Sequence, residues 1–188
     1  MIYTSGTTGQ PKGVRREPVP AALQQSMLER ARIGFGLQPG ARALMTGPLY
    51  HSAPNAYART VIALGGDLIL MPRFDATEFL AEVEKHSITH VHMVPTMFVR
   101  LLNLPAIERR EYDLQSLESV VHGAAPCAPT VKHRMIEWWG PIINEYYGST
   151  EAGLVTYVNS KEWLHKVGTV GRPISDSIIQ IHDGAGNL

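Results

Sequence analysis

DLILMPRFDATEFLAEVEKHSITHVHMV, residues 67–94, contains two short apolar segments separated by a sequence with helical spacing. Residues 67–71 and 88–94 are short and apolar, and each is followed by a proline, a pattern typical of buried strands. Between them, Asp75 or Thr77 can cap a helix. That helix is predicted to run through residue 86 and to bury Phe79, Leu80 and Val83. Strand, helix and strand in this order form the repeating unit of a parallel sheet.

The same alternation of strands and helices extends in both directions from this unit. Further strands are predicted at 41–47, 117–122, 142–146 and 177–182, and residues 1–3 resemble the end of another. Further helices are predicted at about 21–33, 54–64 and 96–104, and after Pro126 to about Trp139. The sequence therefore predicts an α/β fold with a mixed, mostly parallel sheet flanked by helices. Ligands of such sheets bind at loops beyond the carboxyl ends of strands, and three loops fit that position: 4–13, 123–126 and 147–151.

The composition is that of an ordinary globular domain. The 188 residues are 44% hydrophobic and 18% charged, and 17 basic side chains balance 17 acidic ones. A net charge of zero argues against a broad basic surface, so we expect no nucleic-acid partner. The single cysteine, Cys127, indicates a reducing compartment, and we expect a cytoplasmic protein. The longest apolar stretch, 60–71, is broken by Gly65, Gly66 and Asp67 and is too short to span a bilayer.

The first of the three loops, Thr4-Ser5-Gly6-Thr7-Thr8-Gly9-Gln10-Pro11-Lys12-Gly13, is suited to binding an anion. Its glycines let the backbone turn and bring N–H groups close to a phosphate, its hydroxyls donate hydrogen bonds, and Lys12 adds a positive charge. It is not a Walker loop, because Pro11 stands where that motif requires a glycine and Gly13 where it requires serine or threonine. The residue types therefore predict a polyphosphate site of another kind.

Residues 3–14 closely resemble the phosphate loop of the adenylate-forming (AMP-binding) superfamily, which includes acyl-CoA synthetases, luciferases and the adenylation domains of peptide synthetases. Two further segments resemble family motifs in the family's order. Gly123-Ala124-Ala125-Pro126 is similar to the loop that lines the adenine and the substrate carboxylate. Tyr147-Gly148-Ser149-Thr150-Glu151 is similar to the strand-end motif that holds the nucleotide. The resemblance covers essentially the whole chain and is greatest to acyl-CoA synthetases.

The resemblance implies a role for each matching residue. Nucleotide-binding positions are Thr4, Ser5, Gly6, Thr7, Thr8, Gly9, Lys12, Gly123, Ala124, Ala125, Tyr147, Gly148 and Thr150. Within this set the first loop would hold the β- and γ-phosphates, and Tyr147 would stack on adenine. Thr150 would bond the α-phosphate, and Glu151 would help to hold Mg²⁺, a cation that takes oxygen ligands. Lys12, Thr150 and Glu151 are thus the implied catalytic residues, with ATP and Mg²⁺ as cofactors.

The resemblance also implies an acyl pocket. Its predicted lining residues are His51, Val94, Gly123 and Val155. Pro48-Leu49-Tyr50-His51-Ser52 resembles a family stretch in which the histidine borders the acyl group, although Pro54 stands where a glycine is common. Amino-acid-activating members carry an aspartate in this region, whereas Asp75 of this chain lies too far along the sequence. The implied substrate is therefore a fatty, aryl or other plain carboxylic acid, which is activated with release of pyrophosphate and passed to coenzyme A.

The ends of the chain suggest a fragment of such a ligase. The opening strand is too short to bury itself, and the turn at 183–187 leads to no further strand. The family's Thr-Gly-Asp ribose segment and C-terminal lysine domain are not in the sequence. We expect residues 1–172 to form a partial nucleotide- and acyl-binding core, and residues 173–188 to begin a β-rich subdomain. Two alternatives stay open: a truncated nucleotide-binding protein without catalysis, and an amino-acid adenylation domain.

Overall fold

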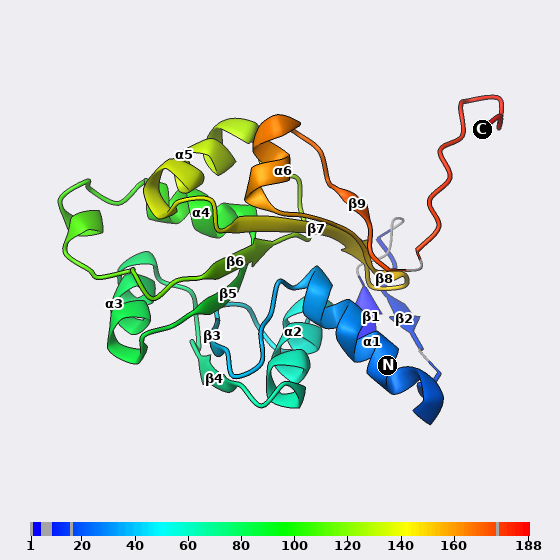
Figure 1. Cartoon of the computed structure of the whole chain (residues 1–188), viewed down its shortest axis with the longest axis horizontal. Helices are drawn as coiled ribbons and strands as arrows, with labels where there is room; N and C mark the ends of the chain where they lie inside the picture. Colours follow the sequence, from blue (N-terminus) through cyan, green and yellow to red (C-terminus); the bar gives the residue numbers. More distant parts are fainter. Residues whose placement is uncertain (1, 5–8, 16, 176) are drawn as a thin grey trace.

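The computed structural model describes residues 2–4, 9–15, 17–175 and 177–188, and its elements alternate along the chain (Figure 1). The helices are α1 (Ala21–Gly34), α2 (Ser52–Ala63), α3 (Ala76–His86), α4 (Pro95–Leu102), α5 (Pro129–Trp139) and α6 (Ser160–His165), with a 3₁₀ turn η1 (Glu108–Arg110). The strands are β1 (Ile2–Thr4), β2 (Lys12–Val14), β3 (Arg42–Met45), β4 (Asp67–Leu70), β5 (His90–Met93), β6 (Ser119–His122), β7 (Ile143–Ser149), β8 (Gly153–Val158) and β9 (Arg172–Pro173). The elements predicted between residues 21 and 146 are confirmed, with ends that differ by a few residues.

Within the described residues, one sheet of seven strands organises the fold, in the order β4-β3-β5-β6-β7-β8-β9. The strands from β4 to β7 in this order are parallel, and β8 and β9 continue the β7 edge antiparallel. The predicted mixed, mostly parallel sheet is therefore confirmed. Parallel strands of one sheet need long crossover connections, and α2, α3, α4 and α5 each lie in such a connection.

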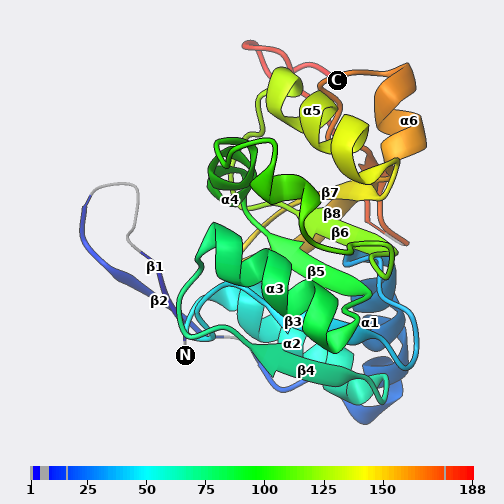
Figure 2. The same cartoon turned by 90° about the vertical axis from the view of Figure 1, so that its left-hand side faces the viewer.

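Helices cover both faces of the sheet (Figures 1 and 2). On one face, side chains of α3, α4 and α5 form a core with strand residues that include Leu44 and Val120. On the other face, α1 and α2 pack on the neighbours of those residues, Ala43, Met45 and Val121. Successive residues of a strand point to opposite faces, so a strand covered on both faces is apolar without alternation. This is why the strands appear in the sequence as short continuous apolar runs.

The helix α3 forms as its sequence predicts. The carboxylate of Asp75 accepts hydrogen bonds from the backbone N–H groups of Thr77 and Glu78, each at 3.0 Å. The three side chains predicted to be buried, Phe79, Leu80 and Val83, have no exposed surface. Asp75 is therefore a helix cap. In the described parts of the chain, none of the helices is long and apolar enough to cross a membrane.

The glycine loop lies in a different setting from the predicted one. β1 and β2 pair antiparallel with each other, with Ile2 opposite Val14 and Thr4 opposite Lys12, in a two-stranded sheet separate from the seven-stranded one. The loop therefore closes a hairpin, which stands apart from the layers in Figure 2, and does not follow a strand of the parallel sheet. The physical reason is local, because residues 12–14 lie close enough along the chain to pair with residues 2–4.

The predicted strand at 177–182 is wrong. These residues have no strand pairing, and Ile178 and Ile181 are 89% and 82% exposed. An apolar run forms a strand only where a neighbour accepts its hydrogen bonds, and β9 is the last described strand to join the sheet. The turn after it does form, since Oδ1 of Asp183 accepts from the backbone N–H groups of Ala185 and Asn187. The division of the chain between residues 172 and 173 stays a prediction.

Candidate functional site

The carboxyl ends of β3, β5, β6 and β7 lie along one edge of the sheet, because these strands are parallel. β3 and β5 are neighbours in the sheet. The connection after β3 leads away to β4 on one side, and the connection after β5 leads to β6 on the other side. Ligands of open α/β sheets bind in the crevice at such a switch point. The predicted residues that follow these strands are, in order, His51, Val94, Gly123 and Thr150. The topology therefore brings four predicted site residues to one edge.

A side-chain contact joins the turn after β7 to the start of α2. The hydroxyl oxygens of Ser52 and Thr150 lie 3.0 Å apart, at hydrogen-bond distance, across 98 positions of sequence. Ser52 is the first residue of α2, and His51 precedes it with an exposed ring 4.6 Å from the ring of Tyr50. The segments predicted to serve the acyl group and the α-phosphate therefore meet. No sequence pattern singles out Ser52 beyond its place beside His51.

Gly123 is buried against the ring of Tyr146. A Cβ at residue 123 would lie 2.5 Å from Cζ of Tyr146, so a side chain does not fit there without displacing the ring. The Tyr146 hydroxyl in turn lies 3.0 Å from Nε2 of His92. Ala124 follows with a φ of 65°, a left-handed conformation that is rare for a residue with a side chain. The loop after β6 therefore runs close to the sheet and presents a short, exposed stretch of small residues at its edge.

The two groups that pack under Gly123, His92 and Tyr146, are buried and carry no charge at neutral pH. Burial lowers the pKa of His92 to about 4, so its imidazole is neutral at pH 7. Burial also raises the pKa of Tyr146. The rings of Phe35 and Tyr57 surround the same pair, with centroids 6.0 Å and 5.4 Å from that of His92. The contact between His92 and Tyr146 therefore serves to orient the tyrosine ring under Gly123.

The end of β7 presents an aromatic ring to solvent. Tyr146 and Tyr147 are neighbours on a strand and point to opposite faces, and Tyr147 is 57% exposed. The next residue, Gly148, allows a close approach of the backbone, because a Cβ there would lie 2.1 Å from the carbonyl oxygen of Gly153. The pairing of β7 and β8 shifts register at this point and leaves Val155 without a Cα partner on β7. Such a bulge can re-aim a side chain, and Val155 is half-buried.

The described phosphate- and metal-binding residues of the prediction belong to two segments, the hairpin and the turn after β7. Thr4 and Lys12 pair across the hairpin, and the side chain of Lys12 and the loop residue Gly9 are exposed. The predicted residues Ser5, Gly6, Thr7 and Thr8 lie outside the described residues. Glu151 is exposed in the turn after β7. The described part of the chain has no group of three or more His, Cys, Asp or Glu side chains arranged for a metal, whereas Mg²⁺ is usually held by one or two carboxylates together with substrate phosphates.

A buried ion pair lies below the same edge. Nζ of Lys132, on α5, lies 2.7 Å from Oε2 of Glu145, on β7. Nε2 of His122, at the end of β6, lies 3.5 Å from the same oxygen without hydrogen-bond geometry. Burial lowers the pKa of Lys132, and its hydrogen bond to Glu145 opposes that shift. Burial, followed by the charge of Lys132, lowers the pKa of His122 well below its usual value. No motif marks these residues, and with His133 and Asn144 as direct neighbours the two charges do not stand out in the sequence.

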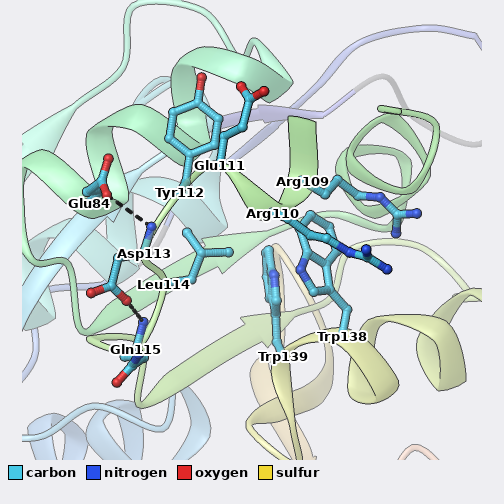
Figure 3. Close-up of a pocket in the computed structure, with 10 residues that line it drawn as sticks. All are labelled: Glu84, Arg109, Arg110, Glu111, Tyr112, Asp113, Leu114, Gln115, Trp138 and Trp139. Carbon is cyan, nitrogen blue, oxygen red and sulfur yellow. Dashed lines mark hydrogen bonds between the residues drawn. The ribbon is translucent and has the colours of Figure 1, made fainter. Parts of the chain in front are cut away.

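A surface hollow of about 530 Å³ lies away from this edge (Figure 3). It is lined by Glu84 of α3, the segment 109–115, and Trp138 and Trp139 at the end of α5. The segment 109–115 precedes β6, and Trp139 precedes β7, so the hollow lies toward the amino ends of the strands. The carboxylate of Glu84 accepts from the backbone N–H of Asp113 at 3.1 Å, which holds this segment in place. The hollow is therefore separate from the edge that carries the predicted site residues.

Comparison with known proteins gives consistent matches over the whole chain. A family model described as "AMP-binding enzyme" matches residues 1–188. A curated relative, the medium/long-chain-fatty-acid–CoA ligase FadD8 of Mycobacterium tuberculosis, is 37% identical over 175 residues, which are 92% of this chain and 30% of the relative. The chain therefore spans less than a third of the length of that relative.

Solved structures share the fold. The amide bond synthetase McbA from Marinactinospora thermotolerans matches with a TM-score of 0.85 at 30% identity, over 98% of this chain and 36% of that protein. The o-succinylbenzoate CoA synthetase MenE from Bacillus subtilis, in complex with ATP and magnesium ion, matches with a TM-score of 0.81 at 23% identity, over 100% of this chain and 38% of that protein. Both structures confirm the predicted α/β fold. The similarity to MenE, at 23% identity, concerns the fold alone.

Proposed function

The chain belongs to the AMP-binding enzyme family, and we propose that it supplies the nucleotide- and acid-binding part of a carboxylic acid–CoA ligase. The observation that carries the proposal is the gathering of the Gly123 loop, Tyr147, Thr150 and His51 at one edge of the sheet. The similarity to a fatty-acid–CoA ligase supports a plain fatty or aryl acid as the substrate. The cofactors proposed are ATP and Mg²⁺, with coenzyme A as the acyl acceptor, and the proposed location is the cytoplasm.

The residues of this edge suit the binding of a nucleotide. The exposed ring of Tyr147 offers a flat surface on which adenine can stack. Ala124 and Ala125 are exposed and have small side chains, which leaves the backbone of the loop after Gly123 accessible to a planar base. The Thr150 hydroxyl lies at the end of β7 beside Ser52, where it can donate a hydrogen bond to an α-phosphate oxygen. The exposed carboxylate of Glu151, next to it, is an oxygen ligand of the kind that Mg²⁺ accepts.

The proposed chemistry has two steps. An oxygen of the substrate carboxylate attacks the α-phosphorus, and the bond from that phosphorus to the bridging oxygen breaks, so that pyrophosphate leaves with the electron pair. Lys12 and the hydroxyls of the glycine loop stabilise the charge that develops on the departing phosphates. Bound Mg²⁺ supplies further neutralisation of the same charge. In the second step the thiol of coenzyme A gives up its proton to solvent and its sulfur attacks the acyl carbon. The bond from that carbon to the phosphate oxygen breaks, so that the thioester forms and AMP leaves.

Binding of ATP tests the site directly. Calorimetry with ATP and Mg²⁺ is expected to show binding to the chain and a loss of about tenfold in affinity for Thr150→Val, which removes a hydrogen bond to a charged phosphate. Ser52→Ala is the matched control, since it removes the neighbouring hydroxyl and leaves that of Thr150 in place. We expect it to bind within about threefold of the unchanged chain. A chain that binds no ATP, or equal losses in both variants, would contradict the proposed role of Thr150.

Pyrophosphate exchange with a panel of carboxylic acids tests the catalytic part. We expect the 188 residues alone to exchange poorly, because they match 30% of the length of a curated relative and the family resemblance implies further segments for the ribose and for catalysis. Exchange at ordinary enzyme rates, about 1–10³ per second, would show that these segments are dispensable. Binding of ATP without exchange in a longer protein that includes them would identify a nucleotide-binding protein without catalysis. Preferential exchange with amino acids would identify the amino-acid-activating branch.

A further inference from the structure

The ion pair of Lys132 and Glu145 lies next to each segment that frames the proposed adenine site. His122 directly precedes Gly123, and Glu145 lies two residues before Tyr147. Lys132 lies in the first turns of α5, the helix into which the loop 123–128 leads. Oε2 of Glu145 therefore lies near His122, at the strand end before the loop, and near Lys132, on the helix after the loop. Glu145 itself belongs to β7, the strand that carries Tyr147.

The start of α5 depends on contacts other than its own cap. Ala128 occupies the N-cap position and offers no side-chain hydrogen bond to the helix. Lys132 is fully buried, and its Nζ lies 4.7 Å from the ring centroid of Trp163 on α6, in addition to its contact with Glu145. A cation held by a carboxylate on one element and by an aromatic face on another has little freedom to move. The pair therefore fixes the first turns of α5 relative to β7.

Stability alone does not account for a buried ion pair at this position. Desolvation of the two charges offsets most of their attraction, and apolar residues of similar volume hold a core together equally well. A charged hydrogen bond differs from apolar packing in direction, because it fixes one separation between the two elements. That separation is the one between the loop 123–128 and the strand that carries Tyr147.

We propose that the Lys132–Glu145 ion pair is a positioning device that holds the loop 123–128 at a set distance from Tyr147 and so defines the width of the adenine slot. The proposal rests on the proposed function for the identity of the ligand. Lys132 and Glu145 act through the backbone of the two segments and contact no nucleotide. Loosening the pair releases the loop while the two cores on the faces of the sheet stay intact.

Cys127 provides a reporter of loop release that needs no ligand. It is the single cysteine of the chain, it lies inside the loop, and it is partly buried. Burial, followed by the charge of Glu145, raises its pKa to about 11, and the charge of Lys132 opposes that shift. Removing the charge of Lys132 therefore slows alkylation of Cys127 if the loop stays in place, whereas release of the loop speeds it. The two explanations predict changes of opposite sign.

Alkylation of Cys127 by iodoacetamide in Lys132→Met is the first test. We expect the rate to rise about tenfold, because removal of one partner of a buried pair frees the segments that it joins. Lys161→Met, an exposed lysine on α6, is the matched control and should leave the rate unchanged. A rate that is unchanged or lower in Lys132→Met, in a chain with unaltered circular dichroism, would overturn the proposal.

The double variant Lys132→Met with Glu145→Gln guards against a failure to fold, because it leaves no buried charge without a partner. Hydrogen exchange reports on the loop at the amides of residues 131 and 132, which donate to the carbonyl oxygen of its last residue, Ala128. It is expected to speed up about tenfold there and to stay unchanged at Val91 in the centre of the sheet. Unchanged exchange in the loop would overturn the proposal. Faster exchange at Val91 as well as in the loop would also overturn it, since the pair would then hold the whole fold.

Calorimetry with ATP and with inorganic tripolyphosphate separates the slot from the phosphate site. The double variant is expected to lose about tenfold in affinity for ATP and to keep its affinity for tripolyphosphate. An equal loss for both ligands would contradict a role at adenine. If the unchanged chain binds no ATP, the proposed function fails, whereas the alkylation and exchange results still decide whether the pair positions the loop.

Discussion

Replacing Gly123 by alanine tests the close approach of the loop after β6 to the sheet. The added Cβ would lie 2.5, 2.7 and 2.8 Å from Cζ, Cε1 and Cε2 of Tyr146, well below the roughly 3.5 Å at which carbon atoms attract each other. The ring has little room to move, because its hydroxyl contacts His92 at 3.0 Å and its edge packs on Phe35 with centroids 5.6 Å apart. Overlap of this kind in a packed core lowers the free energy of unfolding by about 1–3 kcal/mol.

Urea unfolding of the purified chain measures this loss. Gly184→Ala is the matched control, since no atom lies within 4 Å of the Cβ position there, and it should stay within about 0.5 kcal/mol of the unchanged chain. Thermal unfolding provides a second measurement, in which a loss of about 1 kcal/mol lowers the midpoint by about 2–4 °C in a chain of this size. A Gly123→Ala chain that unfolds at the same urea concentration as the control would refute the reasoning, because the loop would then have room for a methyl group.

Two further predictions concern stability. The pKa of His92 is about 4 in the folded chain against an ordinary value of 6.5. The unfolded chain therefore takes up the proton first as the pH falls. The contribution of His92 to the free energy of unfolding is fully present above about pH 6.5 and decreases by about 3 kcal/mol toward pH 4. His92→Gln should flatten this part of the curve of stability against pH, and an equal acid slope in both chains would contradict the assignment. Asp75→Ala removes the acceptor of two backbone N–H groups of α3 and should lower the free energy of unfolding by about 1 kcal/mol in thermal denaturation; an unchanged midpoint would show that the cap is dispensable.

Much of the secondary structure follows from short-range patterns. The region 67–94 forms β4, α3 and β5 because its apolar runs, its capping aspartate and its helical spacing all act within a few residues of one another. The spacing of Leu23 and Met27 likewise predicts α1, although both side chains are about half exposed and the helix reaches the core farther along, at Ala31. Periodicity thus identifies the helix without identifying which of its residues are covered.

Such short-range patterns predict the pairing between strands less well. Residues 2–4 and 177–182 are both short segments with apolar side chains, yet the first segment pairs with 12–14 and the second pairs with nothing in the described chain. A strand needs a partner for its hydrogen bonds, and the identity of the partner depends on the arrangement of the whole sheet. The sequence therefore predicts the residue types of the glycine loop and not the kind of strand that it follows, which belongs to a separate hairpin.

The candidate site divides in the same way. Motif resemblance identifies three parts of the site, because each belongs to a local run of residue types: the segments 123–126 and 147–151, and His51. The contact of Ser52 with Thr150 spans 98 positions, and the pair of Lys132 and Glu145 joins a helix to a strand. Neither contact has a sequence signature, since the side chains involved are common types without a fixed spacing.

The amino-acid sequence is thus sufficient for the class of fold, the positions of most helices and strands, and the segments that meet at the candidate site. The three-dimensional arrangement adds the order of the strands, the switch point between β3 and β5, and the buried ion pair below the loops. The reason is physical: periodicity, capping and turn chemistry act between residues close in sequence, whereas strand order and burial depend on which distant segments pack together. The adenine slot proposed between Gly123 and Tyr147 is a product of that packing, although each of its sides is recognisable in the sequence.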